Sequence, residues 1–280
     1  MVADLENGSV TGFLNAQKRR VVSIYRQPKE DPPTYVEHLG SGTLMQLAGR
    51  YFLATAAHVL DSTDAYDLGC YAMKEGRLAS HVLRGLKHVT PIPEGGRDAD
   101  KIDVGVMILD GGDVDFFGPE NFYSPTDCEL RHRCRITCLY SALGYPNTKN
   151  EPDIRSSKLE KRPFSMSGHG ARQEYFKKFG VAEDSHVLIE YDGRKTRTAG
   201  GPIQTAPRLT GISGGPTFRF RDYLKEGDQS PKIVGLNIET HKSGSDRLVL
   251  STNIGYVLTA MQRVVEEIQQ GPDPGRGQAA

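Results

Sequence analysis

Several features that mark other classes of protein are missing from this chain. Lys and Arg total 35, and Asp and Glu also total 35, so the formal net charge is zero. A neutral chain is a poor candidate for binding nucleic acid or an anionic membrane surface by charge alone. No stretch approaches the roughly 20 apolar residues that cross a bilayer, and no segment repeats at a fixed period. The sequence therefore predicts no nucleic-acid partner and no membrane partner.

Two further absences concern the compartment and the cofactors. Residues 1–20 do not have the order of basic and apolar regions that a secretory signal needs, so we expect a cytoplasmic location. The glycine pair Gly168-His169-Gly170 lacks the strand–helix setting of a phosphate-binding loop. The sequence therefore offers no phosphate-binding loop for a nucleotide cofactor.

Cysteine is scarce, with four residues in a chain of 280. In a cytoplasmic protein these are expected to be reduced thiols. Three of them lie near a histidine in the spacing Cys-x3-His-x-Cys-x3-Cys, which matches no familiar zinc pattern. Buried thiols without metal are the favoured interpretation, and a zinc site is the alternative. The residues concerned are Cys128, His132, Cys134 and Cys138, and the remaining cysteine is Cys70.

Glycine (31 residues) and proline (16 residues) are plentiful and lie between short segments rich in β-branched and aromatic residues. This pattern is typical of many short strands joined by turns. One helix is predicted near the C-terminus, where apolar residues recur at spacings of three and four. The sequence predicts an all-β fold with one C-terminal α-helix. The apolar stripe of that helix consists of Val257, Leu258, Met261, Val264, Val265 and Ile268.

Composition also divides the chain into units. A linker with prolines at 117–127 separates two β-rich halves, and the second half contains a long charged segment with a short helix expected at 172–179. The expected units are a loosely attached N-terminal extension at 1–19, a first half at 20–125, a second half at 126–253 with an insertion at 147–184, the helix at 254–270 and a disordered tail at 271–280.

The stretch Thr210–Pro216 places one serine among three glycines. A serine that attacks a carbonyl needs a tight turn, and glycine permits the positive φ angles that such a turn uses. The N–H groups of Gly211 and Ser213 could then point at a developing oxyanion. The alternative is a Gly/Pro loop that contains a serine by chance.

A serine nucleophile needs a base, and histidine is the usual one at neutral pH. Of eight histidines, His58 differs because it follows a strand and small neighbours that leave room for an imidazole, although a buried structural histidine remains possible. The carboxylate that orients it should be largely buried, which favours Asp103 at the head of an apolar strand. Asp98 and Asp100 are close rivals in a polar loop, and a solvent-exposed Asp103 is the other interpretation.

The three residues occur in the order His58, Asp103, Ser213, and here the chain resembles the chymotrypsin-like (trypsin-like) serine proteases. The resemblance spans roughly residues 20 to 270. It implies two antiparallel six-stranded β-barrels, with His58 as general base, Asp103 as its orienter, Ser213 as nucleophile, and the N–H groups of Gly211 and Ser213 as the oxyanion hole. The matching motifs are Thr55-Ala56-Ala57-His58, Asp103-Val104-Gly105-Val106, Gly211-Ile212-Ser213-Gly214-Gly215-Pro216, Gly40-Ser41-Gly42 and Val234-Gly235-Leu236.

Two positions depart from the secreted digestive members of that family. Ile212 stands where they have an aspartate that pairs with a new N-terminus, so no activation by N-terminal cleavage is expected. Val59 stands where they have a disulfide cysteine. Both departures make the chain similar to bacterial intracellular or HtrA-like members without disulfides, and to viral members.

The resemblance also places a substrate-binding pocket just before the serine motif and on the strand after it. The corresponding residues here are Pro207, Ile238, Glu239 and Thr240. Glu239 could favour a Lys or Arg side chain of the substrate, or it could be a glutamate at the solvent-exposed rim.

The sequence thus predicts a serine endopeptidase that acts on a peptide or protein substrate through an acyl-enzyme. This chemistry needs no cofactor, so none is expected. A catalytically idle protease fold used for binding or scaffolding is the alternative. A third possibility is an enzyme gated by a regulatory protein partner or by the segment 147–184.

Overall fold

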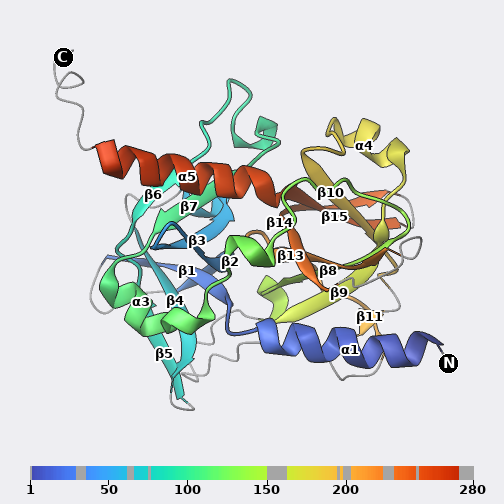
Figure 1. Cartoon of the computed structure of the whole chain (residues 1–280), viewed down its shortest axis with the longest axis horizontal. Coiled ribbons are helices and arrows are strands. Elements are labelled where there is room, and N and C mark those ends of the chain that lie inside the picture. The colour runs from blue at the N-terminus through green and yellow to red at the C-terminus, as the bar shows by residue number, and fades with distance from the viewer. Residues whose placement is uncertain are drawn as a thin grey trace.

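The structure is a computed structural model. Helices α1 (Val2–Gln17) and α5 (Ile254–Gln270) lie on opposite sides of two β-rich units that stand side by side (Figure 1). The residues that it describes are 2–29, 36–61, 66–74, 77–149, 163–193, 196–197, 203–222, 230–243 and 246–270.

The first unit is a seven-stranded antiparallel sheet in the order β5-β4-β1-β2-β3-β7-β6. Its hairpin β2–β3 turns at Ala48-Gly49, where both residues have positive φ (50° and 72°), as a two-residue hairpin turn requires. The resemblance implied a six-stranded barrel here, whereas this unit is an open half-barrel. The strands are β1 (Val21–Pro28), β2 (Glu37–Leu47), β3 (Arg50–Ala56), β4 (Tyr66–Lys74), β5 (Arg77–Val82), β6 (Leu86–Val89) and β7 (Val104–Ile108).

The second unit is a closed six-stranded barrel, β10-β15-β14-β13-β8-β9, which confirms the predicted fold for this half. A separate pair, β11 (Thr196–Arg197) and β12 (Ile203–Gln204), lies outside it. The barrel strands are β8 (Cys138–Gly144), β9 (Phe164–Gly170), β10 (His186–Tyr191), β13 (Pro216–Asp222), β14 (Lys232–Ser243) and β15 (Asp246–Asn253).

The C-terminal helix α5 (Ile254–Gln270) confirms the prediction from the apolar stripe. It follows β15 of the barrel but packs on β7 as well as on β14, so it ties the two units together (Figure 1). Five of the six stripe residues are buried, and Ile268 in the last turn is 39 % exposed. No helix in the described ranges is long and apolar enough to cross a membrane.

The expectation of a loosely attached N-terminus is wrong for residues 10–17. Residues Val2–Gln17 form helix α1, and the ring of Phe13 packs edge-on against Phe218 (5.2 Å) and Phe220 (5.3 Å) of β13. Leu14 is buried, and Gln17 Oε1 accepts a hydrogen bond from the Tyr123 hydroxyl (2.9 Å). These residues lie on one helical face, whose short apolar part, Phe13 and Leu14, was concealed by the polar composition of the segment.

The expectation of an insertion at 147–184 is also wrong for its second half. Strand β9 is a member of the barrel, paired with β8 and β10. The short helix predicted at 172–179 is α4 (Gln173–Phe179). The part at 150–162 and the tail at 271–280 lie outside the described residues. The remaining short helices are α2 (Ala57–Leu60), α3 (Gly111–Phe117), η1 (Arg97–Ala99), η2 (Pro119–Asn121), η3 (Pro125–Asp127) and η4 (Asn147–Lys149).

Candidate active site

Pairing between β3 and β7 brings His58 and Asp103 together. Ala56 is the register partner of Val104, so the residues that follow β3 lie beside the residue that precedes β7. The Ala57 N–H donates to the Asp103 carbonyl oxygen (3.0 Å), which fixes the start of α2 against the strand. Two residues 45 positions apart in the chain are thus neighbours because of strand register.

The carboxylate of Asp103 accepts two hydrogen bonds from His58. Its Oδ2 accepts from the imidazole Nδ1 (2.6 Å), and its Oδ1 accepts from the His58 backbone N–H (3.0 Å). The carboxylate is buried at 4 % exposure, and its backbone has a φ of +46°, a conformation that aspartate tolerates better than most residues. With Nδ1–H donating to the carboxylate, Nε2 is the nitrogen left to accept a proton.

The two rival acids lie elsewhere. Asp100 accepts from Arg97 Nη1 (2.6 Å) and from the Thr90 hydroxyl, in a network that holds the loop before β7. Asp98 is exposed. Of the three acids that the sequence offered, Asp103 is the one that contacts His58.

The environment raises the pKa of His58 above the ordinary value for histidine. Burial is the largest single influence and acts in the opposite direction, because it disfavours the charged ring. The hydrogen bond and the charge of Asp103, together with the charges of Asp61 and Glu239, outweigh it. The site therefore stabilises the protonated form of the His58 ring.

The serine turn requires glycine at two positions. Gly211 has a φ of +96° and Gly214 a φ of +90°. A Cβ on Gly211 would overlap the Asn147 side chain, and a Cβ on Gly214 would overlap the Ser41 carbonyl. Both residues therefore combine a backbone conformation that favours glycine with a space that admits no side chain.

Strand β2 of the first unit forms hydrogen bonds that hold the serine turn of the second unit. The Ser41 N–H donates to the Ser213 carbonyl (2.8 Å), and the Ser41 hydroxyl donates to the Gly211 carbonyl (2.8 Å). The Thr43 hydroxyl donates to the Gly214 carbonyl (2.9 Å). The segment Gly40-Ser41-Gly42 thus brings the serine turn to the unit that carries His58.

The hydroxyl of Ser213 donates to the carbonyl oxygen of Ile238 on β14 (2.9 Å). Within the described part of the chain it makes no hydrogen bond with His58. The N–H groups of Gly211 and Ser213 donate to no acceptor among the described residues. These two donors are available to a developing oxyanion.

Asn147 is a site residue that the sequence analysis did not identify. Its N–H donates to the Thr210 carbonyl (2.7 Å), and its Oδ1 accepts from His38 Nδ1 (2.7 Å). It contacts Gly211 directly, as the overlap above shows. No local pattern marks Asn147, since its partners lie more than 60 positions away in either direction.

The residues expected to bind substrate fall into two groups. Pro207 and Thr240 line a cavity of about 230 Å³, whereas Ile238 is buried and presents its carbonyl to Ser213. Glu239 is outside the lining of that cavity and pairs with His241 (3.0 Å). The contact with the His241 ring is the main reason that the pKa of Glu239 is lowered.

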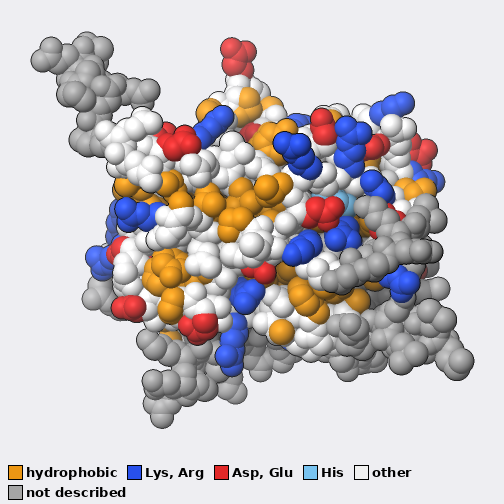
Figure 2. Space-filling view, viewed as in Figure 1, with side chains coloured by type: hydrophobic (Ala, Val, Ile, Leu, Met, Phe, Trp, Pro, Cys, Tyr) orange, Lys and Arg blue, Asp and Glu red, His pale blue; other side chains and the backbone are white. Residues whose placement is uncertain are grey.

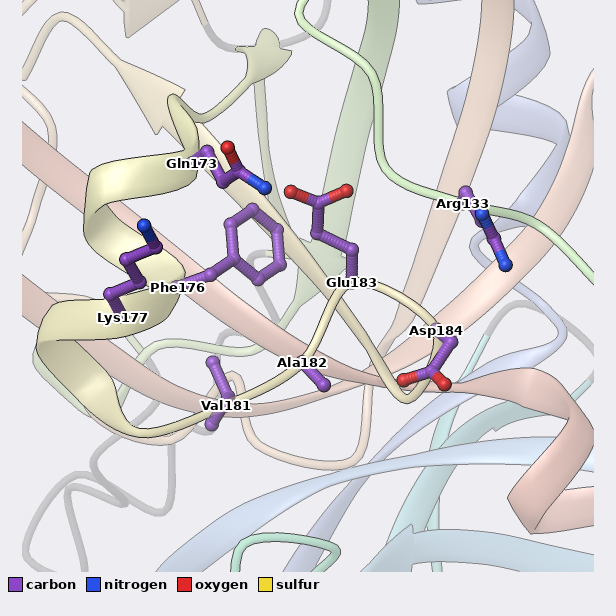
Figure 3. Close-up of a pocket in the computed structure, with 8 residues that line it drawn as sticks. All are labelled: Arg133, Gln173, Phe176, Lys177, Val181, Ala182, Glu183 and Asp184. Carbon is purple, nitrogen blue, oxygen red and sulfur yellow. The ribbon is translucent and has the colours of Figure 1, made fainter.

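Two other cavities contain no comparable group of catalytic residues among the described residues that line them. One, of about 300 Å³, lies between α4 and the start of β10, where Gln173 and Glu183 point toward each other beside the ring of Phe176 (Figure 3). The other is a groove of about 1060 Å³ along α5, with Leu130 and Tyr256 among its exposed apolar residues, and apolar side chains gather on this face (Figure 2).

The residues considered for zinc have separate partners. His132 lies between Glu129 (3.1 Å) and the Tyr140 hydroxyl (2.7 Å), and Cys134 Sγ donates to the Leu188 carbonyl. Burial raises the pKa of Cys128 to about 12 and that of Cys134 to about 11, which keeps both thiols protonated.

The half-barrel, the closed barrel and the C-terminal helix together define a chymotrypsin-like fold, with the candidate triad where the two units meet. Human heparin binding protein is similar in structure, with a TM-score of 0.51, 13 % identity and coverage of 93 % of this chain and 96 % of that one. A mutant of the same protein has a TM-score of 0.54 at 12 % identity, with the same coverage. A thermostable serine protease from an extremophilic microorganism has a TM-score of 0.49, 13 % identity and coverage of 89 % and 95 %. No protein-family model and no curated protein matches the sequence.

Proposed function

We propose that the protein is a serine endopeptidase with Ser213 as nucleophile, His58 as general base and Asp103 as the residue that positions His58. The observation that carries the proposal is the double attachment of His58 to a buried carboxylate, which sets the tautomer a general base needs. A histidine with a purely structural role would not need a neighbouring glycine-rich turn that contains a serine and is held in place by β2.

In the proposed reaction Ser213 rotates toward His58, and Nε2 takes its proton as Oγ attacks the carbonyl carbon of a peptide bond. The N–H groups of Gly211 and Ser213 stabilise the oxyanion. His58 then gives the proton to the leaving amine, and an acyl-enzyme remains. Water hydrolyses this ester by the same steps in reverse order. None of these steps uses a cofactor.

The hydrogen bond from the Ser213 hydroxyl to the Ile238 carbonyl supports a role for the substrate in activating Ser213. A serine that donates to a backbone carbonyl is not activated as a nucleophile. A substrate N–H that takes over the Ile238 carbonyl would release the Ser213 hydroxyl toward His58. The same effect from a regulatory protein would gate the enzyme, which keeps a protein partner within the proposal.

The environment of Ile212 supports a mode of regulation in which no new N-terminus has to be released by cleavage. Its side chain is buried at 3 % exposure, and its N–H donates to the Leu209 carbonyl (3.1 Å). The turn is therefore formed without an ion pair at this position. We extend the proposal to a cytoplasmic enzyme similar to the intracellular and HtrA-like members, without disulfides.

Labelling with a fluorophosphonate probe tests the function. The wild-type protein should form a covalent adduct whose peptide maps to Ser213, and Ser213→Ala should not be labelled. The second candidate is a binding protein with an idle site. Two observations favour it: the Ser213 hydroxyl donates to Ile238 and not to His58 among the described residues, and two of the similar structures are of human heparin binding protein and its mutant. An unlabelled, folded wild-type protein would favour that candidate.

Gly211→Ala should lower kcat/KM by a factor of about 10²–10³, the usual effect of losing one oxyanion donor. The new Cβ would collide with Asn147 and Tyr145, and the φ of +96° strains any side chain, so the turn must move. Gly49→Ala is a matched control with a φ of +72° and open space. Peptidase kinetics of the two variants separate the loss of the oxyanion donor from the effect of backbone strain alone. Equal kcat/KM values for the two variants would contradict the proposed oxyanion hole.

Glu239→Gln should shift the acidic limb of the kcat/KM–pH profile to lower pH. His58 acts in its neutral form, so activity rises as pH passes upward through its raised pKa. The charge of Glu239 contributes to that raised pKa, although less than Asp103 does. Glu267→Gln, on the exposed side of α5, is the control and should leave the profile unchanged. An unchanged limb in Glu239→Gln would show that Glu239 does not act on His58.

A further inference from the structure

A cavity of about 230 Å³ opens beside the serine turn. The loop before the turn forms one wall, and β14 and β15 form another. Thr210, in its lining, directly precedes Gly211, and Thr240 follows Ile238, the acceptor of the Ser213 hydroxyl, by two positions. The cavity is therefore next to the atoms that would act on a substrate.

The charged side chains that line this cavity are cations. Arg208 comes from the loop, Lys242 from β14 and Arg247 from β15. No acidic residue is among the described residues that line it. None of the three cations forms an ion pair with an acid in the described part of the chain, so their charges are not neutralised by a close partner.

Polar groups in the lining complement these cations. Thr205, Thr240 and Tyr191 bring hydroxyl groups, and His241 brings an imidazole. Arg247 lies close to Gly193 and acts electrostatically on Tyr191, where it opposes the rise in pKa that burial causes. Charges of one sign around a small concave space raise its potential and favour an anion there.

The volume suits one side chain. A water molecule occupies about 30 Å³ in the liquid, so the cavity has room for on the order of seven. That accommodates a short carboxylate side chain, while the apolar walls made by Ala206, Pro207 and Leu209 can pack against its methylene groups. An anion with several donors around it forms strong, charge-assisted hydrogen bonds.

We infer that this cavity receives an acidic side chain, so that the endopeptidase cleaves peptide bonds on the carboxyl side of Glu or Asp. This substrate class rests on the proposed function, because it assigns the residue whose carbonyl Ser213 attacks. It also replaces the interpretation that Glu239 selects Lys or Arg. Glu239 is outside the cavity and already paired with His241, and a cationic side chain would meet three like charges.

The activity test uses a peptide series with constant flanking residues and Glu, Asp, Gln or Lys at the cleaved position. The kcat/KM for Glu or Asp should exceed that for Gln by about tenfold or more, because a site built for hydrogen bonds and charge rejects an analogue that lacks them. Arg247→Gln and Lys242→Gln should each reduce this ratio, and the double variant should reduce it furthest. Lys177→Gln on α4, outside the cavity, is the control. Equal rates for Glu and Gln, or faster cleavage after Lys, would overturn the inference.

A binding test separates this inference from the proposed function. The Ser213→Ala variant cannot turn over, so fluorescence anisotropy can compare its affinity for the Glu and Gln peptides. Tighter binding of the Glu peptide that is lost in Ser213→Ala/Arg247→Gln supports the acid-selective cavity, even if the fluorophosphonate probe does not label the wild type. Labelling of Ser213 without any preference for Glu over Gln would leave the peptidase proposal standing and overturn the cavity's assignment.

Discussion

Ser213→Ala is expected to lower the kcat of peptide hydrolysis by a factor on the order of 10⁶, the loss seen when the nucleophile of a coupled triad is removed. Without the Oγ no acyl-enzyme can form, and only the oxyanion donors and substrate binding remain to accelerate attack by water. Single-turnover and steady-state assays of purified variants measure the loss.

The Ser213 variant should remain folded, which makes the result interpretable. The hydroxyl makes one hydrogen bond, to the Ile238 carbonyl, and such a bond contributes about 1 kcal/mol net. Thermal unfolding should therefore change little. Ser230→Ala, at an exposed position, is the matched control and should retain full activity. If Ser213→Ala kept peptidase activity, the nucleophile would have to be another residue.

Asp103→Asn is expected to lower kcat by a factor of about 10⁴. The amide would donate to Nδ1 of His58, which moves the ring proton to Nε2, and Nε2 could then no longer accept the proton of Ser213. Asparagine is the right replacement, because it tolerates the φ of +46° at this position and keeps an acceptor for the His58 N–H. Alanine would add backbone strain to the loss of the carboxylate.

Asp100→Asn is the comparison that distinguishes the two acids. Asp100 interacts with Arg97 and Thr90, so its neutral variant should weaken the loop before β7 and leave kcat within a few-fold of wild type. The pH profile adds a second readout, since loss of the Asp103 charge should lower the pKa of His58. A larger effect at Asp100 than at Asp103 would mean that the acid has been assigned wrongly.

Much of the fold was accessible from local pattern. The apolar stripe of α5 and the short β-branched segments are signals that depend on residues close in the chain, and both were predicted correctly. Helix α1 was missed because its stripe is short and its stability comes from Phe13 docking on Phe218 and Phe220. That contact joins residues more than 200 positions apart, and no local propensity reports it.

The sequence by itself determined the candidate residues and their order: a glycine-rich serine turn, a histidine after a strand and an acid before one. These are properties of residue type and spacing. Only the tertiary structure decided which acid contacts His58, that Ser213 donates to Ile238, that Asn147 braces the turn, and that three cations border the neighbouring cavity. Each of these depends on strand register and on side chains from distant segments, and the free energy of such contacts is set by packing in three dimensions rather than by neighbours along the chain.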